Sequence, residues 1–181
     1  MDFIQIISEI REGNERSFKL LYETYAPQFK GIAYRYTSDA NVANDMVQES
    51  FIKIYKSIKT YKGDGNFEGW MKRILVNNCL NYIKREQKYV FEIGDALIER
   101  PSSSWDEAID VLSFDEIILL IDKLPVGYKT VFNLSVFEGY AHKEIGELLG
   151  ISESASRSQL TKAKSKLKVE LKKLNIFSSI A

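Results

Sequence analysis

Residues 144–160 read Glu144-Ile-Gly-Glu-Leu-Leu-Gly150-Ile-Ser152-Glu-Ser-Ala-Ser-Arg157-Ser-Gln-Leu160. The first part carries apolar residues at helical spacing and ends at Gly150, because glycine readily adopts the left-handed conformation that closes a helix. A second helix with its own cap then begins and continues to about Leu167. The stretch predicts a helix-turn-helix motif between Ala141 and Leu167.

The second helix of this motif has a face of small and cationic side chains opposite Leu160 and Ala163, at about 100° per residue. This face, which we call the recognition face, consists of Ser154, Arg157, Ser158, Thr161 and Lys162. Small side chains allow close approach to base edges, and arginine can form two hydrogen bonds to guanine. The pattern favours binding in a DNA groove, although a purely structural helical hairpin also explains it.

The N-terminal half predicts three further helices from apolar residues at three- and four-residue steps. The first begins after Asn14, which can act as an N-cap, and Pro27 predicts a kink or break in it near Ala26. The second begins at Ser38-Asp39 and reaches Ile58, and the third extends over residues 67–88. Glycines on both sides of Asp64 predict an exposed loop before the third helix.

The third predicted helix has a polar face away from its buried stripe of Met71, Leu75 and Cys79. This polar face consists of Arg73, Asn77, Asn81, Lys84 and Arg85, and Asn66 precedes it in the loop. Asparagine can pair with adenine edges, and arginine or lysine can contact phosphate. The helix could therefore lie along a nucleic-acid strand, and a merely solvated polar face is the alternative.

The formal net charge is zero, but charge is segregated along the chain. Residues 53–91 and 123–181 are basic, whereas residues 92–122 carry nine acidic residues and only one arginine. Gly94, Pro101 and three serines interrupt the periodicity there. We therefore expect an all-α fold with two small helical domains, residues 1–91 and 114–181, joined by an acidic linker over residues 92–113.

Composition also excludes several classes of protein. The longest apolar run, residues 117–121, is far shorter than the roughly 20 residues of a membrane span, so we expect a cytoplasmic protein without membrane insertion. One cysteine, Cys79, and one histidine, His142, leave no cluster for zinc. We expect no metal, no cofactor and no catalytic residues, since no nucleophile triad or phosphate-binding glycine loop is present.

Together these elements resemble the extracytoplasmic-function (ECF) group of bacterial sigma factors. The segment Asp45-Met-Val-Gln48-Glu49-Ser-Phe51 is similar to the family's segment for binding core RNA polymerase. The segment from Phe67 through Trp70, Arg73, Asn77 and Asn81 to Lys84-Arg85 is similar to its minus-ten helix. The helix-turn-helix resembles its minus-thirty-five reader, with Ser156 at a position that is usually apolar.

The resemblance implies a sigma factor that binds core RNA polymerase, recognises and melts promoter DNA, and leaves the chemistry to polymerase. It implies polymerase contacts by Asp45, Gln48, Glu49 and Phe51, capture of a flipped base by the loop at Asn66, and an anti-sigma factor as partner. A helix-turn-helix regulator that binds operators by itself as a dimer is the main alternative. A nucleic-acid-modifying enzyme is a weaker one.

Overall fold

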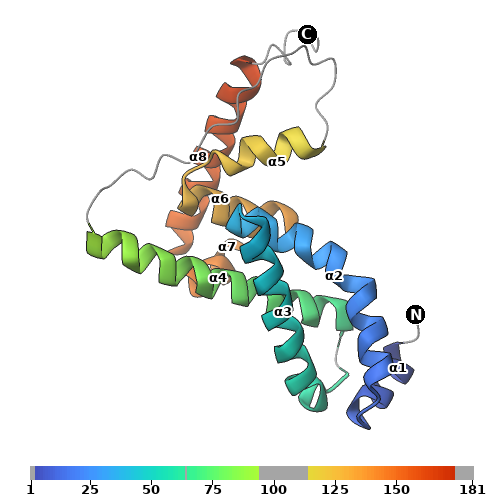
Figure 1. The fold of residues 1–181 in the computed structure, drawn as a ribbon. Helices are drawn as coiled ribbons and strands as arrows, with labels where there is room; N and C mark the ends of the chain where they lie inside the picture. The colour runs from blue at the N-terminus through green and yellow to red at the C-terminus, as the bar shows by residue number, and fades with distance from the viewer. Residues whose placement is uncertain (1–2, 64, 94–113, 174–181) are drawn as a thin grey trace. The chain divides into compact units, whose positions relative to one another are not determined.

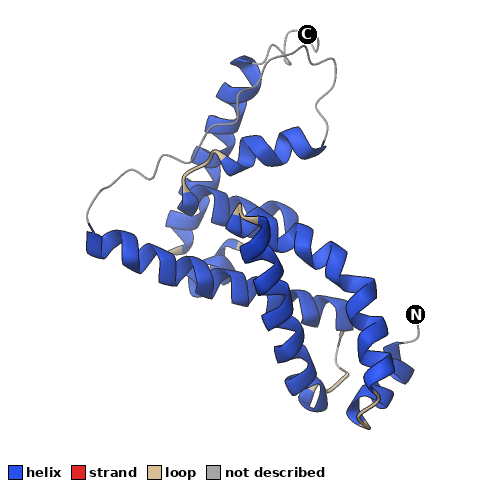
Figure 2. Ribbon diagram, viewed as in Figure 1, coloured by secondary structure: helices blue, strands red, loops and turns tan. Residues whose placement is uncertain are grey.

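The computed structural model describes residues 3–63, 65–93 and 114–173, which are helical apart from short turns and include no strand (Figures 1 and 2). The chain divides into two compact units, Met1–Asp95 and Ala96–Ala181, which are described separately below. The expected all-α class with two helical domains is confirmed. Residues 94–113, which hold most of the expected linker, lie outside the described residues.

The first unit contains α1 (Phe3–Arg11), α2 (Glu15–Thr37), α3 (Ala40–Ser57), a 3-10 turn η1 (Ile58–Thr60) and α4 (Phe67–Ile93). Helices α2, α3 and α4 pack against one another, and α1 packs against α2 and η1. Their apolar stripes meet in a core of fully buried side chains: Leu21, Phe29, Ala33, Ile54, Met71, Leu75 and Cys79. The periodicity predicted these stripes correctly.

Two predicted caps fix where helices begin. The Asn14 side chain accepts hydrogen bonds from the backbone N–H groups of Arg16 (3.0 Å) and Ser17 (3.3 Å). Asp39 does the same for Asn41 (2.7 Å) and Val42 (3.1 Å). Each such cap stabilises its helix by about 1 kcal/mol, because the first N–H groups of a helix have no partner within it.

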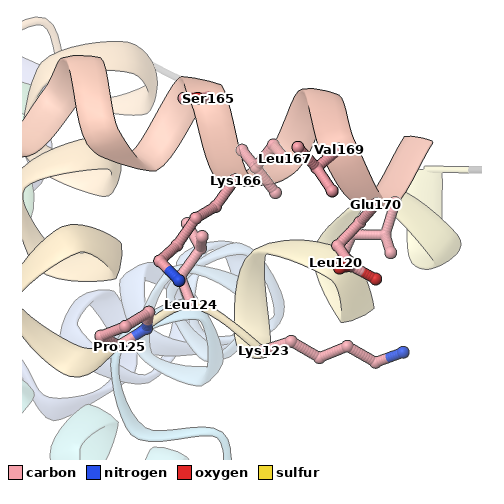
Figure 3. A pocket seen from close by; sticks show the side chains of 9 residues that line it. All are labelled: Leu120, Lys123, Leu124, Pro125, Ser165, Lys166, Leu167, Val169 and Glu170. Carbon is pink, nitrogen blue, oxygen red and sulfur yellow. The ribbon is translucent and has the colours of Figure 1, made fainter. Parts of the chain in front are cut away.

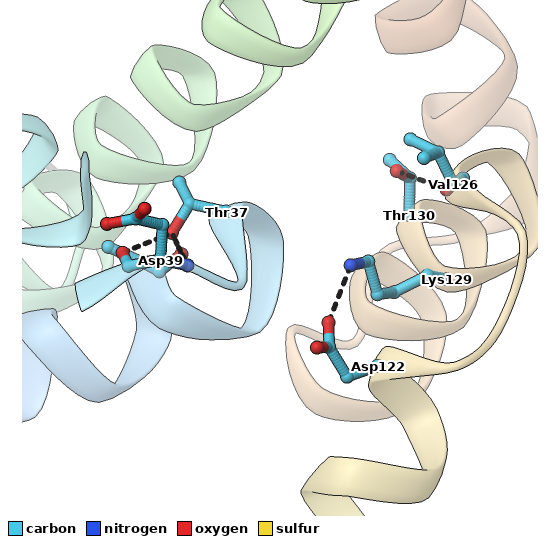
Figure 4. Close-up of polar contacts among 7 residues, drawn as sticks. Thr37, Asp39, Asp122, Val126, Lys129 and Thr130 are labelled. Carbon is cyan, nitrogen blue, oxygen red and sulfur yellow. Dashed lines mark hydrogen bonds and ion pairs between the residues drawn. The ribbon is translucent and has the colours of Figure 1, made fainter. Parts of the chain in front are cut away.

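The turn between α2 and α3 is closed by Thr37 (Figure 4). Its hydroxyl donates toward the carbonyl oxygens of Ala33 and Asp39, at 3.1 Å each. Ser38 adopts a left-handed conformation with φ of 56° and ends α2. The direction change between the two helices therefore needs only a two-residue connection.

The structure of the N-terminal half differs from the expectations in three places. The break considered at Pro27 does not occur: the helix runs unbroken from Glu15 to Thr37 because packing on both sides outweighs the loss of one backbone hydrogen bond at an exposed position. The short helix α1 was not predicted at all, although Ile6, Ile7 and Ile10 are buried. Helix α4 also extends to Ile93, five residues beyond the predicted end.

The second unit contains α5 (Phe114–Asp122), α6 (Val126–Phe132), a π-helical continuation η2 (Asn133–Phe137), α7 (His142–Leu149) and α8 (Glu153–Lys173). Helices α5, α6 and α7 all pack against α8. Ile121, Leu124 and Ala163 form a buried cluster, with Tyr128 and Leu167 packed around it. Helix α8 is thus the central support of this unit.

A partly buried ion pair joins α5 to α6 in this unit (Figure 4). Lys129 is only 2% exposed, and its ammonium lies 2.8 Å from a carboxylate oxygen of Asp122. A buried charge is tolerated only when polar partners replace water, so this pair fixes how the two helices meet around Pro125. The turn at Pro125 leads into α6, which packs against α8. Helix α8 is the second helix of the predicted helix-turn-helix.

Candidate nucleic-acid and partner-binding surfaces

The predicted helix-turn-helix consists of α7 and α8 joined through Gly150, which has φ of 71°. The backbone N–H groups of Gly150 and Ile151 donate to the Gly146 carbonyl at 2.9 and 3.0 Å, and Ser152 caps α8 through the Ala155 N–H at 3.0 Å. These bonds close the turn in the manner expected of a left-handed glycine after a helix.

The usually apolar position of Ser156 has a physical explanation. Ser156 is fully buried, and its hydroxyl oxygen lies 2.9 Å from Nδ1 of His142 at the start of α7. A buried hydroxyl needs a polar partner, and His142 provides it across the motif. His142 therefore links α7 to α8.

Gly146→Ala is expected to destabilise the second unit by about 1–2 kcal/mol, because a residue at this place overpacks the turn. A Cβ atom here would meet the Ile151 carbonyl oxygen at 2.7 Å. Thermal unfolding measures the loss. Gly31→Ala, in an open helical position with nothing within 4 Å, is the matched control and should not destabilise. Equal effects of the two variants would contradict the close contact.

The recognition face lies on the N-terminal half of α8, and all its members are exposed: Ser154, Arg157, Ser158, Thr161 and Lys162. Arg157 pairs with Glu153 one turn earlier, and the Thr161 hydroxyl donates to the Arg157 carbonyl at 3.0 Å. The Glu153 pair is solvent-exposed and therefore weak, so Arg157 can exchange it for another acceptor. The face is small, cationic and accessible along one side of the helix.

The polar face of α4 is equally accessible. Every predicted member is exposed, namely Arg73, Asn77, Asn81, Lys84 and Arg85. Asn66 is exposed too, and its side-chain oxygen accepts the Glu68 N–H at 2.9 Å, so it caps α4 while standing beside its first turn. Amides and cations thus follow one side of α4 for several turns.

The loop before α4 rests on packed aromatic rings. The rings of Phe67 and Trp70 stack with centroids 5.4 Å apart, and Tyr61 contacts both. The Tyr61 hydroxyl donates to the Gly65 carbonyl at 2.9 Å, which closes the loop. Tyr61 and Phe67 are buried, so they support the loop and do not offer a face on which a base could stack.

Side chains of helix α1 hold this loop in place. The Arg11 guanidinium donates to the carbonyl oxygens of Ile58, at 3.1 Å, and Tyr61. Phe3 packs on Phe67 with ring centroids 5.5 Å apart. The neighbouring Tyr25 lies in the same aromatic surroundings, and burial together with the Glu68 carboxylate raises its pKa. The phenol of Tyr25 therefore ionises only at a higher pH than an exposed tyrosine.

The middle of α3 presents an acidic face made of Asp45 with Gln48 and Glu49, which follow it by three and four residues; all three are exposed. The structure corrects the fourth predicted member, Phe51. It is 2% exposed, and its ring packs edge-on against Tyr22 with centroids 4.8 Å apart and at a tilt against Phe29 with centroids 5.5 Å apart. Phe51 therefore belongs to the core and supports the acidic face from within.

The second unit also has an apolar hollow of about 480 Å³ between α5 and the C-terminal half of α8 (Figure 3). Its lining includes Leu120, Leu124, Leu167 and Val169, with Lys123 and Lys166 beside them. It lies toward the opposite end of α8 from Arg157, and its mainly apolar wall suits protein side chains better than phosphates. The hollow and the recognition face are therefore separate surfaces of one helix.

Among residues 3–63, 65–93 and 114–173, no three His, Cys, Asp or Glu side chains gather as they would around a metal ion. Cys79 is fully buried in the core. None of the helices described combines the length and hydrophobicity of a membrane span.

Comparison with known proteins gives concordant matches in both units. The model of sigma-70 region 2 matches residues 21–89, and that of sigma-70 region 4 matches residues 114–167. The chain is 27% identical to the ECF RNA polymerase sigma-E factor of Haemophilus influenzae, over 93% of this chain and 95% of that protein. It is 25% identical to the RNA polymerase sigma-H factor of Pseudomonas aeruginosa, over 88% and 89%.

Two solved structures have a similar fold. One is the sigma factor RpoE of Bartonella quintana in complex with the anti-sigma factor NepR, with a TM-score of 0.59, 16% identity, and coverage of 87% of this chain and 98% of that one. The other is CnrH in complex with the cytosolic domain of CnrY, with a TM-score of 0.54, 20% identity, and coverage of 92% and 95%. At these identities the likeness concerns the fold.

Proposed function

The chain belongs to the ECF sigma factors, which direct promoter-specific transcription initiation, and from this premise we propose how its surfaces divide that work. The α3 acidic face binds core RNA polymerase. The α4 polar face and Asn66 contact the minus-ten element and hold it melted. The recognition face of α8 reads the minus-thirty-five element as duplex.

One observation carries this division. The residues chosen from the sequence, Phe51 excepted, are exposed, and they fall on three separate helix faces of different chemistry. Acidic and amide side chains on α3 suit a cationic protein surface. Amides with cations on α4 suit a nucleic-acid strand, and small residues with Arg157 on α8 suit a major groove.

We further propose residues 1–91 and 114–181 as the two functional domains and residues 92–113 as the acidic tether between them. A tether raises the effective concentration of the second contact once the first is made. Two individually weak surfaces can then give a selective complex at a promoter that offers both elements. The chain itself recognises promoter DNA and catalyses no reaction. It acts in the cytoplasm, where core polymerase is found.

An anti-sigma factor is the proposed inhibitory partner. The two similar structures described above are complexes of sigma factors with NepR and with CnrY. A protein that covers the α3 acidic face or the DNA-contacting faces would hold the chain inactive.

Reconstitution tests the proposal. Purified chain is mixed with bacterial core RNA polymerase and passed over a size-exclusion column, and the complex is then tested on promoter DNA. Co-elution together with promoter-dependent transcription supports the proposal. Tight binding of the free chain to duplex DNA as a dimer, without co-elution, would favour the independent operator-binding regulator and overturn it.

A further inference from the structure

We propose that Asn78, a buried residue of α4, positions Glu49 on α3 for the binding of core polymerase. Asn78 would thereby act as a positioning residue of the polymerase surface, although it lies on the helix assigned to the promoter strand. The inference rests on the proposed function of the α3 acidic face.

The contacts of Asn78 all reach one turn of α3. Its side chain is 4% exposed, and its amide nitrogen lies 3.3 Å from each of three acceptors: the Met46 carbonyl, Glu49 Oε2 and Ser50 Oγ. Its amide oxygen accepts a hydrogen bond from the Lys53 ammonium. Asn78 therefore touches both the backbone of α3 and two of its charged side chains.

The amide is oriented by the charges on either side of it. Its oxygen faces the cation of Lys53 and its nitrogen faces the anion of Glu49, which is the favourable arrangement of the amide dipole at both ends. Hydrogen bonds to charged groups are stronger than neutral ones, and burial of the amide limits competition from water. The hydrogen bond from Asn78 thereby restricts the exposed Glu49 side chain on the side that faces the protein core.

Holding Glu49 in one position has a direct consequence for binding. A long exposed side chain loses rotamer freedom when a partner immobilises it, and this loss weakens the complex. A carboxylate that is already fixed loses less. Asn77, the preceding residue, is exposed on the polar face of α4. Asn78 instead points into the core and contacts α3, so two successive residues of one helix serve different proposed surfaces.

A purely structural role is the competing explanation, in which Asn78 only joins α4 to α3 through Met46 and Ser50. The two roles differ in one measurable respect. If Asn78 acts through Glu49, then its effect on polymerase binding disappears once the Glu49 carboxylate is removed. If it only stabilises the fold, its effect is the same with or without Glu49.

The experiment is a double-mutant cycle on the full chain, with the dissociation constant for core polymerase as the readout. Asn78→Leu is expected to weaken binding about fivefold in the wild-type background and by less than about twofold in the Glu49→Ala background. Glu86→Gln, at an exposed position of α4 outside all proposed surfaces, is the matched control. Thermal unfolding of every variant accompanies the cycle.

A second variant covers the case in which Asn78→Leu does not fold. Asn78→Asp keeps the shape and the acceptor for Lys53, but it places a carboxylate against Glu49. It is expected to weaken polymerase binding about tenfold relative to the wild-type chain. In the Glu49→Gln background, where the Gln amide can donate to the new carboxylate, it should weaken binding only about twofold relative to Glu49→Gln alone. This rescue would not follow from a loss of stability alone.

The outcomes separate the two proposals. If Glu49→Ala weakens binding but the effects of Asn78 and Glu49 substitutions multiply independently, then the positioning role is overturned and the polymerase surface stands. If Glu49→Ala leaves binding unchanged, then the assignment of the α3 acidic face fails, and the inference fails with it. Non-multiplicative effects in both cycles support the positioning role.

Discussion

Glu49→Lys is expected to weaken binding of the full chain to core polymerase by at least about 100-fold, which corresponds to about 2.7 kcal/mol. Glu49 is exposed on the α3 acidic face, and its carboxylate accepts a hydrogen bond from the amide of the buried Asn78 at 3.3 Å. Reversal removes an attractive charge and sets a cation against a partner surface that must itself be cationic. The substitution also separates Asn78 from its anionic acceptor, so both causes act in the same direction.

Co-elution of chain and polymerase, followed by a titration, measures this effect. Glu23→Lys is the matched control, because Glu23 is an exposed glutamate of α2 outside the proposed surfaces, and its pair with Lys19 spans 3.7 Å in solvent. Loss of that pair costs at most about 0.5 kcal/mol of stability. If both variants reduce binding equally, or neither does, then the polymerase surface lies elsewhere.

Much of the fold was predictable because apolar periodicity and capping residues determine where its helices begin, end and pack. Asn14, Asp39 and Gly150 end or begin helices where the sequence placed those boundaries. Helix α1 was missed even though Phe3, Ile6, Ile7 and Ile10 have helical spacing, because nine residues form a stable helix only when packed. That packing, against α2 and η1, becomes evident only once the helices are assembled.

Pro27 shows the opposite error, in which a local rule was applied without its surroundings. Proline disfavours a helix interior by roughly 3 kcal/mol. Buried residues on the same helix, such as Leu21 before it and Phe29 after it, pack into the core. Their combined burial outweighs the local cost, so α2 continues through the proline.

The candidate surfaces were predictable to the extent that helix faces are. A helical wheel separates Asn77 from the buried stripe correctly, and the same reasoning separates Arg157 from Ala163. The family resemblance added Phe51 to the polymerase contacts, but a family motif does not say which of its residues face inward, and Phe51 is buried. The helical wheel overlooked Asn78, whose partners Glu49 and Lys53 are separated from it by 29 and 25 residues. Such a contact exists only after α3 and α4 pack.

Arg157→Ala is expected to weaken binding of holoenzyme to duplex carrying the minus-thirty-five element about 30-fold, since one bidentate contact between arginine and guanine discriminates by about 1–3 kcal/mol. Arg157 is exposed near the start of α8, with only a solvent-exposed Glu153 as its ion-pair partner. Lys162 and the lysines beyond it would still contact phosphates, so the salt dependence of binding should change little. Competition binding on duplex promoter fragments measures the loss.

Asn77→Ala should show the complementary defect, with near-normal duplex binding but promoter opening slowed about tenfold, because its amide lies on α4 and not on α8. Fluorescence of a base analogue in the minus-ten element measures opening. Asn77 and Arg157 are both exposed polar residues of helices, so each variant serves as the control for the other. An equal loss at both steps in both variants would mean that the two helices do not divide recognition and melting between them.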